Sequence, residues 1–237
     1  TRRDWMRVLG ATGVATGAGA LAGNERAYAD PAQRKDAPRG VRVAGPDHPP
    51  AILRDGKVIQ PERQLALLHE TDVLVVGGGP AGVVAALAAK RAGVRATLVE
   101  RYGHLGGLWT GGLVLIVIGH IVTGKKQVCQ GIGEEMMRRL EKLDRGICNR
   151  QPGRNPTVDA EALKYVMVEM VMEEELDVFL HCWGVDAIME GNTVRGAVFE
   201  SKSGRQAILA KVVVDASGDG DVFGADVEAP ERDAGGR

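Results

Sequence analysis

The chain has 237 residues, a formal net charge of −1, 44% hydrophobic residues and 26% charged residues, which describes a globular protein of one large or two small domains. The net charge is close to zero, which argues against a basic surface that binds nucleic acid. Only 4% of the residues are aromatic, so side chains that stack on bases are few. No apolar run is long enough to span a bilayer, so we expect neither a nucleic-acid partner nor a membrane span.

The first 29 residues carry three features of an export signal in the correct order. Residues 1–7 read Thr-Arg-Arg-Asp-Trp-Met-Arg, residues 8–23 form a mildly apolar stretch rich in Gly and Ala, and residues 27–29 form an Ala-Tyr-Ala cleavage site. The arrangement resembles the twin-arginine signal, whose pattern is Ser/Thr-Arg-Arg-x-Phe-Leu-Lys. It predicts export by a twin-arginine route to the periplasm or the exterior, with the export machinery as a partner. A flexible basic arm is the alternative.

Residues 30–70 predict a Pro-rich tether followed by a small hairpin. Five prolines lie among charged residues and glycines between residues 30 and 50, a composition typical of an extended linker. Two apolar pairs, Ile52-Leu53 and Val58-Ile59, flank Asp55-Gly56, a dipeptide that favours a tight hairpin turn. We expect the main domain to begin at residue 71.

Residues 71–101 contain every element of a nucleotide-binding βαβ unit. Residues 72–76 are a short apolar run rich in β-branched side chains, which predicts a buried parallel strand. A helix is predicted over residues 81–92 and a second strand over residues 94–99, which leads into Glu100. Between the first strand and the helix lies a G-x-G-x-x-G spacing, made of Gly77, Gly78, Gly79, Pro80, Ala81 and Gly82.

The residues of this unit have separate physical roles in dinucleotide-binding folds. Gly77 permits the tight turn, Gly79 lets the backbone approach a pyrophosphate, and Gly82 lets helix and strand pack closely. The phosphates lie against the helix N-terminus, where free N–H groups and the helix dipole favour negative charge. Glu100 is placed to accept hydrogen bonds from a ribose hydroxyl. We predict a dinucleotide site here, with a purely structural glycine turn as the alternative.

A glycine-rich loop runs from Glu100-Arg101 to Gly112 and includes Gly106-Gly107. Together with the glycine spacing before it, this order resembles the FAD-binding fingerprint of the glutathione-reductase-like flavoproteins. The wording Glu-Arg-Tyr-Gly-x-Leu-Gly-Gly is similar to a broad family of FAD-dependent oxidoreductases, whereas nicotinamide-binding domains usually lack the trailing Glu-Arg and Gly-Gly pairs. The resemblance implies FAD as the cofactor. It places Glu100 and Arg101 among the binding residues, Glu100 on the adenosine ribose, and Gly106-Gly107 near the pyrophosphate and the isoalloxazine.

Two histidines lie in or just beyond this loop. The resemblance places His104 in a loop beside the flavin, so it is a candidate functional residue, with a solvent-facing loop histidine as the alternative. His120 lies within residues 113–122, an apolar stretch that predicts a strand or a buried crossover. We expect His120 to be a satisfied core histidine rather than a catalyst. No catalytic acid or base is identified.

Two helices are predicted next, over residues 131–143 and 159–176, with methionines on their buried stripes and Asp159 near the N-terminus of the second, where it favours the dipole. The hydrophobic period then changes to that of strands. Four short strands are predicted over residues 178–185, 187–190, 193–201 and 206–214. They resemble the β-meander that these flavoproteins insert before the sheet of the nucleotide domain resumes, and the resemblance implies that backbone at Val185 meets the adenine.

The last of these strands ends in Ala216-Ser217-Gly218-Asp219. This sequence resembles the Ala-Thr-Gly motif of the same family, with Ser217 in place of Thr, and implies that the four residues contact the cofactor. Asp219 and Asp221 form a D-x-D pair, but the other ligands of a calcium loop are missing, so no metal is predicted.

The three cysteines, Cys129, Cys148 and Cys182, form no C-x-x-C pair. The absence of a redox disulfide after the glycine loop argues against a disulfide reductase. Export would permit one disulfide and leave one free thiol, and the sequence does not choose the pair.

These observations predict an α/β protein whose residues 71–237 form a Rossmann-like FAD/NAD(P)-binding domain with a parallel sheet and an inserted β-meander. The predicted function is that of a flavin-dependent oxidoreductase, which passes a hydride or electron pair between a small organic substrate and FAD, with a separate electron acceptor. Related flavoproteins continue past the Ala-Ser-Gly strand into a substrate domain, so we expect the chain to be truncated or a minimal version of the fold. A non-catalytic dinucleotide-binding fragment is the first alternative, and a nicotinamide-dependent dehydrogenase is the second.

Overall fold

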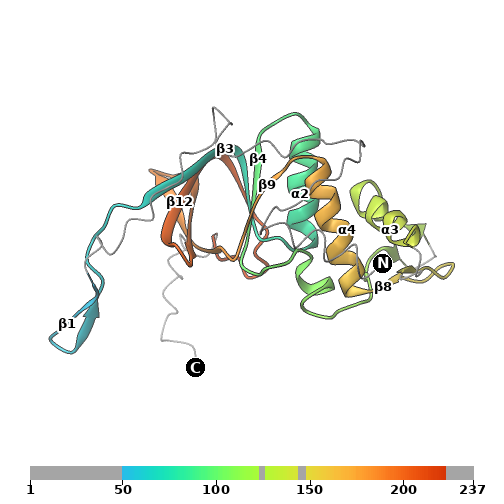
Figure 1. The fold of residues 1–237 in the computed structure, drawn as a ribbon, viewed down its shortest axis with the longest axis horizontal. Coiled ribbons are helices and arrows are strands. Elements are labelled where there is room, and N and C mark those ends of the chain that lie inside the picture. Colours follow the sequence, from blue (N-terminus) through green and yellow to red (C-terminus); the bar gives the residue numbers. More distant parts are fainter. Residues whose placement is uncertain (1–49, 123–125, 144–147, 223–237) are drawn as a thin grey trace, which may run out of the picture. The chain divides into compact units, whose positions relative to one another are not determined.

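The computed structural model describes residues 50–122, 126–143 and 148–222, and the predicted export signal and most of the predicted tether lie outside them. Its centre is a six-stranded sheet in the order β10-β11-β12-β3-β4-β9 (Figure 1). The four strands from β12 to β9 run parallel, and β10, β11 and β12 run antiparallel. The predicted α/β fold with a parallel sheet is confirmed. The strand bounds are β3 (Ala66–Val76), β4 (Ala96–Glu100), β9 (Asp177–Leu180), β10 (Trp183–Glu190), β11 (Thr193–Ser201) and β12 (Gly204–Asp215).

Three α-helices and several short elements complete the described part. The helices are α2 (Pro80–Arg91), α3 (Ile132–Glu141) and α4 (Ala160–Glu173), and the loop after β4 contains a 3-10 turn, η2 (Gly107–Trp109). The two-residue strands are β5 (Ile121–Val122), β6 (Lys126–Gln127), β7 (Cys148–Asn149) and β8 (Thr157–Val158). The βαβ unit predicted over residues 71–101 is therefore present as β3, α2 and β4, with the strand starting earlier than expected.

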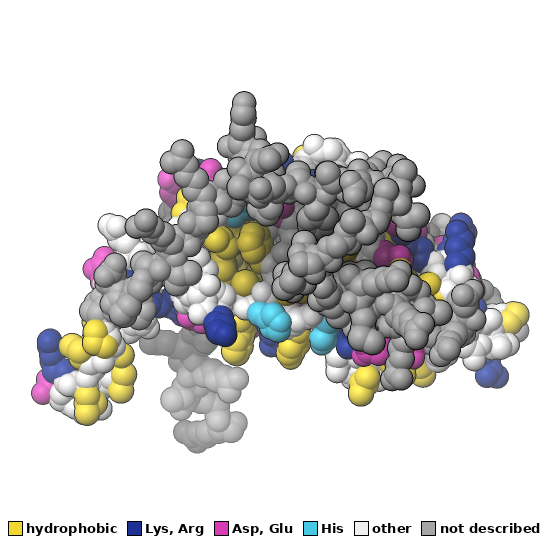
Figure 2. All heavy atoms as spheres, viewed as in Figure 1, with side chains coloured by type: hydrophobic (Ala, Val, Ile, Leu, Met, Phe, Trp, Pro, Cys, Tyr) yellow, Lys and Arg dark blue, Asp and Glu magenta, His cyan; other side chains and the backbone are white. Residues whose placement is uncertain are grey.

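The predicted hairpin forms as β1 (Ile52–Arg54) and β2 (Lys57–Ile59). Asp55 and Gly56 both adopt positive φ, 53° and 74°, which a tight two-residue turn requires and which Asp and Gly tolerate best. Its apolar side chains face solvent, as the yellow side chains of this hairpin show in Figure 2.

The sheet buries a different apolar cluster on each face because side chains of a strand alternate in direction. On one face, Val75 and Leu98 pack against helix residues such as Val83, and α2 and α4 cover this face (Figure 1). On the other face, Leu74 and Val76 pack against a cluster that includes Phe199 of β11. Both faces of the parallel strands are thus buried, as expected for a parallel sheet.

Helix α4 begins where the sequence predicted. Asp159 is its N-cap, and the side chain accepts a hydrogen bond from the backbone N–H of Ala162 at 2.8 Å. The four methionines on the predicted stripes of α3 and α4 are fully buried: Met136, Met137, Met167 and Met170. Met172, near the end of α4, is exposed.

The strand or buried crossover predicted over residues 113–122 is wrong for most of its length. Only Ile121–Val122 is a strand, and Leu113 and Ile118 are exposed although Val117 is buried. The segment makes an isolated bridge between Ile116 and Thr157 and single backbone hydrogen bonds, such as Val117 N–H to Pro156 O, rather than a continuous strand pairing. Positive φ at Leu113 (57°) and at Gly119 (87°) bends it away from extended geometry.

The predicted division of residues 178–190 into two strands is also corrected. The chain breaks at His181-Cys182, not near Asp186, because the N–H groups of His181 and Cys182 donate to Tyr102 O and Glu100 O at 3.2 and 2.9 Å. β9 therefore joins the parallel sheet beside β4, while β10 turns back to pair with β11. The antiparallel meander has three strands rather than four.

Candidate dinucleotide-binding site

A cavity of about 610 Å³ lies at the carboxyl ends of β12, β3 and β4, the edge where open α/β sheets bind ligands. This volume is within the usual range of small-molecule sites. Four segments line it: the β3–α2 turn, the loop after β4, the start of β10 and the loop after β12. Eleven residues predicted for cofactor binding are among the lining residues: Gly77, Gly79, Pro80, Ala81, Glu100, Arg101, Gly107, Ala216, Ser217, Gly218 and Asp219.

The other four predicted residues, Gly78, Gly82, Gly106 and Val185, are not among them. Gly82 fulfils the packing role, because a Cβ there would lie 1.8 Å from Gly77 O. Gly106 donates its backbone N–H to Gly78 O at 2.8 Å and so supports the turn from behind. Val185 lies at an irregularity of β10, and the preceding residues of the strand face the cavity instead.

Glu100 is buried, with 4% of its surface exposed, and its carboxylate ties the glycine turn to the following loop. Oε2 accepts a hydrogen bond from the backbone N–H of Gly78 at 2.5 Å, and Oε1 accepts one from that of Tyr102 at 2.7 Å. A carboxylate has further acceptor sites, so these bonds are compatible with an additional ribose hydroxyl. Contact with a ribose stays a prediction.

The N-terminus of α2 fits an anionic diphosphate. Gly79 is the N-cap, no side chain caps the helix, and its first turn contains no acidic residue. A Cβ on Gly79 would meet no atom within 4 Å, so the backbone faces open space there. The first N–H groups of a helix lack partners within it, and Pro80 at the first position has none to satisfy. This turn can therefore hold the pyrophosphate of FAD.

The loop after β12 is held by Asp215, a residue that the sequence did not single out. Its Oδ1 accepts from the N–H and the hydroxyl of Ser217 at 3.0 and 2.7 Å, and its Oδ2 accepts from the N–H of Val222 at 3.1 Å. Ser217 Oγ in turn accepts from the N–H groups of Gly220 and Asp221, both at 3.0 Å. The hydroxyl of Ser217 therefore shapes the cavity wall. The Asp-x-Ser spacing is the signal that could have found it.

Aromatic residues that the sequence did not predict for cofactor binding complete the wall around Arg101. The Arg101 guanidinium lies 4.7 Å from the ring centre of Tyr102 and 6.0 Å from that of Trp183. Its Nη1 lies 3.8 Å from Asp219 Oδ2. His104, the candidate histidine, also lines the cavity, with its ring stacked on Tyr102 at 5.6 Å.

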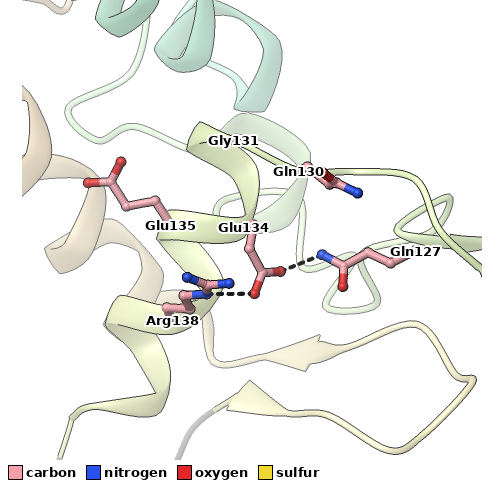
Figure 3. A pocket seen from close by; sticks show the side chains of 6 residues that line it. All are labelled: Gln127, Gln130, Gly131, Glu134, Glu135 and Arg138. Atoms are coloured by element: carbon pink, nitrogen blue, oxygen red, sulfur yellow. Dashed lines mark hydrogen bonds and ion pairs between the residues drawn. The ribbon is translucent and has the colours of Figure 1, made fainter.

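A second pocket of about 470 Å³ lies at the N-terminus of α3 and includes Glu134 (Figure 3). Glu134 is 12% exposed and accepts hydrogen bonds from Gln127, Arg138 and Arg150. Burial alone would raise the pKa of Glu134, but these hydrogen bonds outweigh it and lower the pKa to about 2.

His120 is buried as predicted, but one of its ring nitrogens, Nε2, lacks a hydrogen bond. Nε2 lies 3.4 Å from Glu134 Oε2, close enough for an ion pair if the ring is protonated, but it makes no hydrogen bond of good geometry. Burial, aided by the charge of Arg150, lowers the pKa of His120 and favours the neutral ring.

All three cysteines are free, so the disulfide that export would permit is absent from the structure. Cys129 is exposed, and burial raises the pKa of the Cys148 and Cys182 thiols. In the described ranges no three His, Cys, Asp or Glu side chains are grouped as metal ligands would be, Asp219 and Asp221 included. Helices long and apolar enough to cross a membrane are likewise absent from this part of the chain.

Comparison with known proteins finds similar enzymes that catalyse different reactions, among them a reductase and a monooxygenase. The chain is 28% identical over 149 residues to digeranylgeranylglycerophospholipid reductase 2 of Methanopyrus kandleri, covering 63% of this chain and 38% of the relative. It is 31% identical over 162 residues to 6-methylpretetramide 4-monooxygenase of Streptomyces rimosus, covering 62% and 38%. The crystal structure of Thermovibrio ammonificans THI4 superposes with a TM-score of 0.49 at 25% identity, covering 71% of this chain and 64% of that one.

The chain spans about two fifths of the length of the first curated relatives, 38% and 40%. Residues 72–230, more than half of the chain, match the FAD dependent oxidoreductase family. The match begins at the strand before the glycine turn and includes the whole cavity wall. The chain therefore belongs to the FAD dependent oxidoreductase family, with FAD as its cofactor.

Proposed function

We propose that the protein binds FAD in the cavity at the carboxyl ends of β12, β3 and β4 and passes a hydride or an electron pair between a small organic substrate and the flavin. A separate electron acceptor completes the cycle. The observation that carries the proposal is the convergence, in one cavity, of the free N-terminus of α2, the buried Glu100 and the Gly107 loop.

The residues of the chain bind and orient the cofactor. The α2 N-terminus favours the negative diphosphate through its N–H groups and dipole. Glu100 fixes the glycine turn and offers remaining acceptor sites to the ribose. The Asp215–Ser217 network holds the opposite wall. FAD, once bound, supplies the redox chemistry, while the protein supplies position and electrostatics.

A second candidate function is that of a non-catalytic dinucleotide-binding part of a larger flavoprotein. The observation that favours it is the coverage of the first curated relatives: the aligned part is 38% and 40% of their length. In that case the residues that contact substrate belong to another part of the protein.

A visible absorption spectrum, mass analysis of the released cofactor and a turnover assay with an artificial electron acceptor test the two functions. A flavin band, released FAD and turnover in the presence of candidate donors support the oxidoreductase. Bound FAD that dithionite reduces, but that no donor reduces, supports the second candidate. A protein that stays colourless after incubation with FAD would contradict both.

We also propose that the protein is exported by a twin-arginine route to the periplasm or the exterior. The support is the sequence of residues 1–29 alone, and these residues lie outside the described ranges. Fusion of residues 1–29 to a reporter, expressed in bacteria with and without a functional twin-arginine system, is the test. Export that persists without that system contradicts the proposal.

A further inference from the structure

The wall of the cavity contains a tryptophan that the described part of the protein leaves more than half exposed. Trp183 is the first residue of β10, lines the cavity and is 53% exposed. Its backbone pairs with Glu200 of β11, so most of the exposed surface belongs to the indole ring. Tryptophan is highly buried on average, so an exposed ring in the wall of a binding cavity indicates a contact with the ligand.

Two backbone hydrogen bonds hold Trp183 beside the end of β4. The N–H of Cys182 donates to Glu100 O at 2.9 Å, and the N–H of His181 donates to Tyr102 O at 3.2 Å. These bonds tie the connection between β9 and β10 to the loop after β4, so the backbone that carries the ring is fixed before any ligand binds. Trp183 is therefore close in space to Glu100, the residue predicted to contact the adenosine ribose.

In the described part of the chain, only the Arg101 guanidinium makes a ring contact with Trp183, and this contact is long. Arg101 Cζ lies 6.0 Å from the centre of the Trp183 ring, at the outer limit of a cation–π interaction, and 4.7 Å from that of the Tyr102 ring. Arg101 therefore stacks on Tyr102, and much of the indole surface stays available to a planar group.

FAD has two planar ring systems, the adenine and the isoalloxazine, on opposite sides of its diphosphate. In the proposed function, the N-terminus of α2 holds the diphosphate and Glu100, at the end of the neighbouring strand β4, offers acceptor sites to the adenosine ribose. The adenine is bonded to that ribose. A ring anchored beside Glu100 is therefore within reach of the adenine.

We propose that Trp183 stacks on the adenine ring of FAD and anchors the adenosine end of the cofactor. The inference rests on the proposed function, since it needs FAD in this cavity. Aromatic side chains bind bases through such stacks because every base has a π-face. The family resemblance implied that the adenine meets the backbone at Val185, but Val185 is not among the lining residues, whereas Trp183 and Gly184 are.

Equilibrium binding of FAD and of ADP to the full chain tests this role. Trp183→Ala removes the ring and Trp183→Phe keeps a smaller one. Met189→Ala is the matched control, because Met189 is a 39% exposed residue of β10 outside the cavity. Dissociation constants come from calorimetry, and circular dichroism and the melting temperature confirm that each variant folds.

Tryptophan fluorescence is a second readout of the same contact. ADP carries the adenine without a flavin, so a change on adding ADP cannot arise from energy transfer to a flavin. Trp109→Phe is the control for this measurement, since Trp109 is not among the residues that line the cavity. Should Trp183→Ala fail to fold, the fluorescence of Trp183→Phe decides the question.

The proposal predicts that Trp183→Ala weakens FAD and ADP alike by roughly five- to 150-fold, the range of one base–aromatic stack. Trp183→Phe keeps most of the affinity, and Met189→Ala binds as the wild type does. ADP quenches the tryptophan fluorescence of the wild-type and Trp109→Phe chains, but not that of Trp183→Phe.

Weakened FAD with unchanged ADP would move the ring to the flavin half and overturn the assignment. Unchanged affinity for both ligands, or quenching by ADP that persists in Trp183→Phe, would overturn it as well. If the wild-type chain binds neither ligand, the proposed function fails and this inference fails with it. Wild-type binding with an unaffected Trp183→Ala variant refutes this inference alone.

Discussion

The carboxylate of Glu100 accepts a hydrogen bond from the backbone N–H of Gly78 at 2.5 Å, and so joins the end of β4 to the turn that precedes α2. Glu100 is the last residue of β4, and Gly78 lies in the turn that follows the neighbouring parallel strand β3. The bond fixes the glycine turn before any cofactor binds. Glu100 is thus a structural as well as a candidate binding residue.

We expect Glu100→Gln to lower the free energy of unfolding by about 1.5–3 kcal/mol, the range of a hydrogen bond to a charged group, and to weaken FAD binding. An amide in this buried position loses the charge and presents an NH₂ group where two N–H donors need an acceptor. Urea unfolding of wild type and variant measures the change. Glu190→Gln is the control, since its carboxylate is 70% exposed and pairs with Arg195 at the surface. Equal losses in both variants would contradict the role of Glu100.

Two glycines at the start of α2, the N-cap Gly79 and the helical Gly82, should respond differently to alanine. We expect Gly82→Ala to cost about 3 kcal/mol or more, or to prevent folding, because its Cβ would lie 1.8 Å from Gly77 O. We expect Gly79→Ala to change stability by no more than about 0.5 kcal/mol, since its φ is −67° and open space surrounds the new Cβ, yet to weaken FAD binding at least about tenfold by occupying the diphosphate position. Thermal unfolding and FAD titration separate the two effects. A Gly79→Ala protein with wild-type affinity for FAD would contradict diphosphate binding at the N-terminus of α2.

Ser217→Ala should loosen the loop after β12 while the rest of the sheet stays folded. The change removes the acceptor of the Gly220 and Asp221 N–H groups and one of the donors to Asp215. We expect faster hydrogen exchange in residues 217–222 and weaker FAD binding, by roughly ten-fold for a loss of about 1–2 kcal/mol. Ser217→Thr keeps the hydroxyl and should behave as the wild type. Loss of FAD binding in both variants would show that side-chain size, not the hydroxyl, matters.

The lowered pKa of Glu134, in the second pocket, predicts how folding stability depends on pH. The pKa of Glu134 is lowered to about 2 in the folded protein from an ordinary 4.5, so its ion pairs stabilise the fold above pH 4.5, and this contribution is lost as the pH falls from 4.5 towards 2. We expect Glu134→Gln to be less stable than the wild type at pH 7 and to approach it near pH 2. Chemical unfolding from pH 7 to pH 2 gives the two curves. A difference that stays constant with pH would contradict the assignment.

His120 should cause a separate loss of folding stability as the pH falls. Its pKa is lowered on folding because the ring is buried, so the unfolded chain binds the proton first, and stability falls as the pH drops below about 6.5. The window lies above that of Glu134, and a His120→Gln variant should lack it. A wild-type protein equally stable at pH 7 and pH 5.5 would be the contrary result.

Much of the fold was predictable because its signals are local. The β-branched run of residues 72–76, the glycine spacing and the Asp55-Gly56 turn each encode their conformation within a few residues. The apolar stretch at residues 113–122 was misjudged for the opposite reason. Its composition favours burial, but whether a partner strand covers it depends on distant parts of the chain.

The sequence by itself determined the strand–turn–helix unit, the family and FAD, because a phosphate-binding turn demands particular glycines at particular spacings. Only the tertiary structure decided which residues meet around the cavity. The N–H of Ala216 donates to Val76 O at 2.8 Å and brings the Ser217 loop beside the glycine turn, and no local pattern encodes this pairing of β12 with β3. The stack of Tyr102 on His104 and the dual bonds of Glu100 also depend on packing. Their physical basis is non-local contact, which sequence spacing alone does not specify.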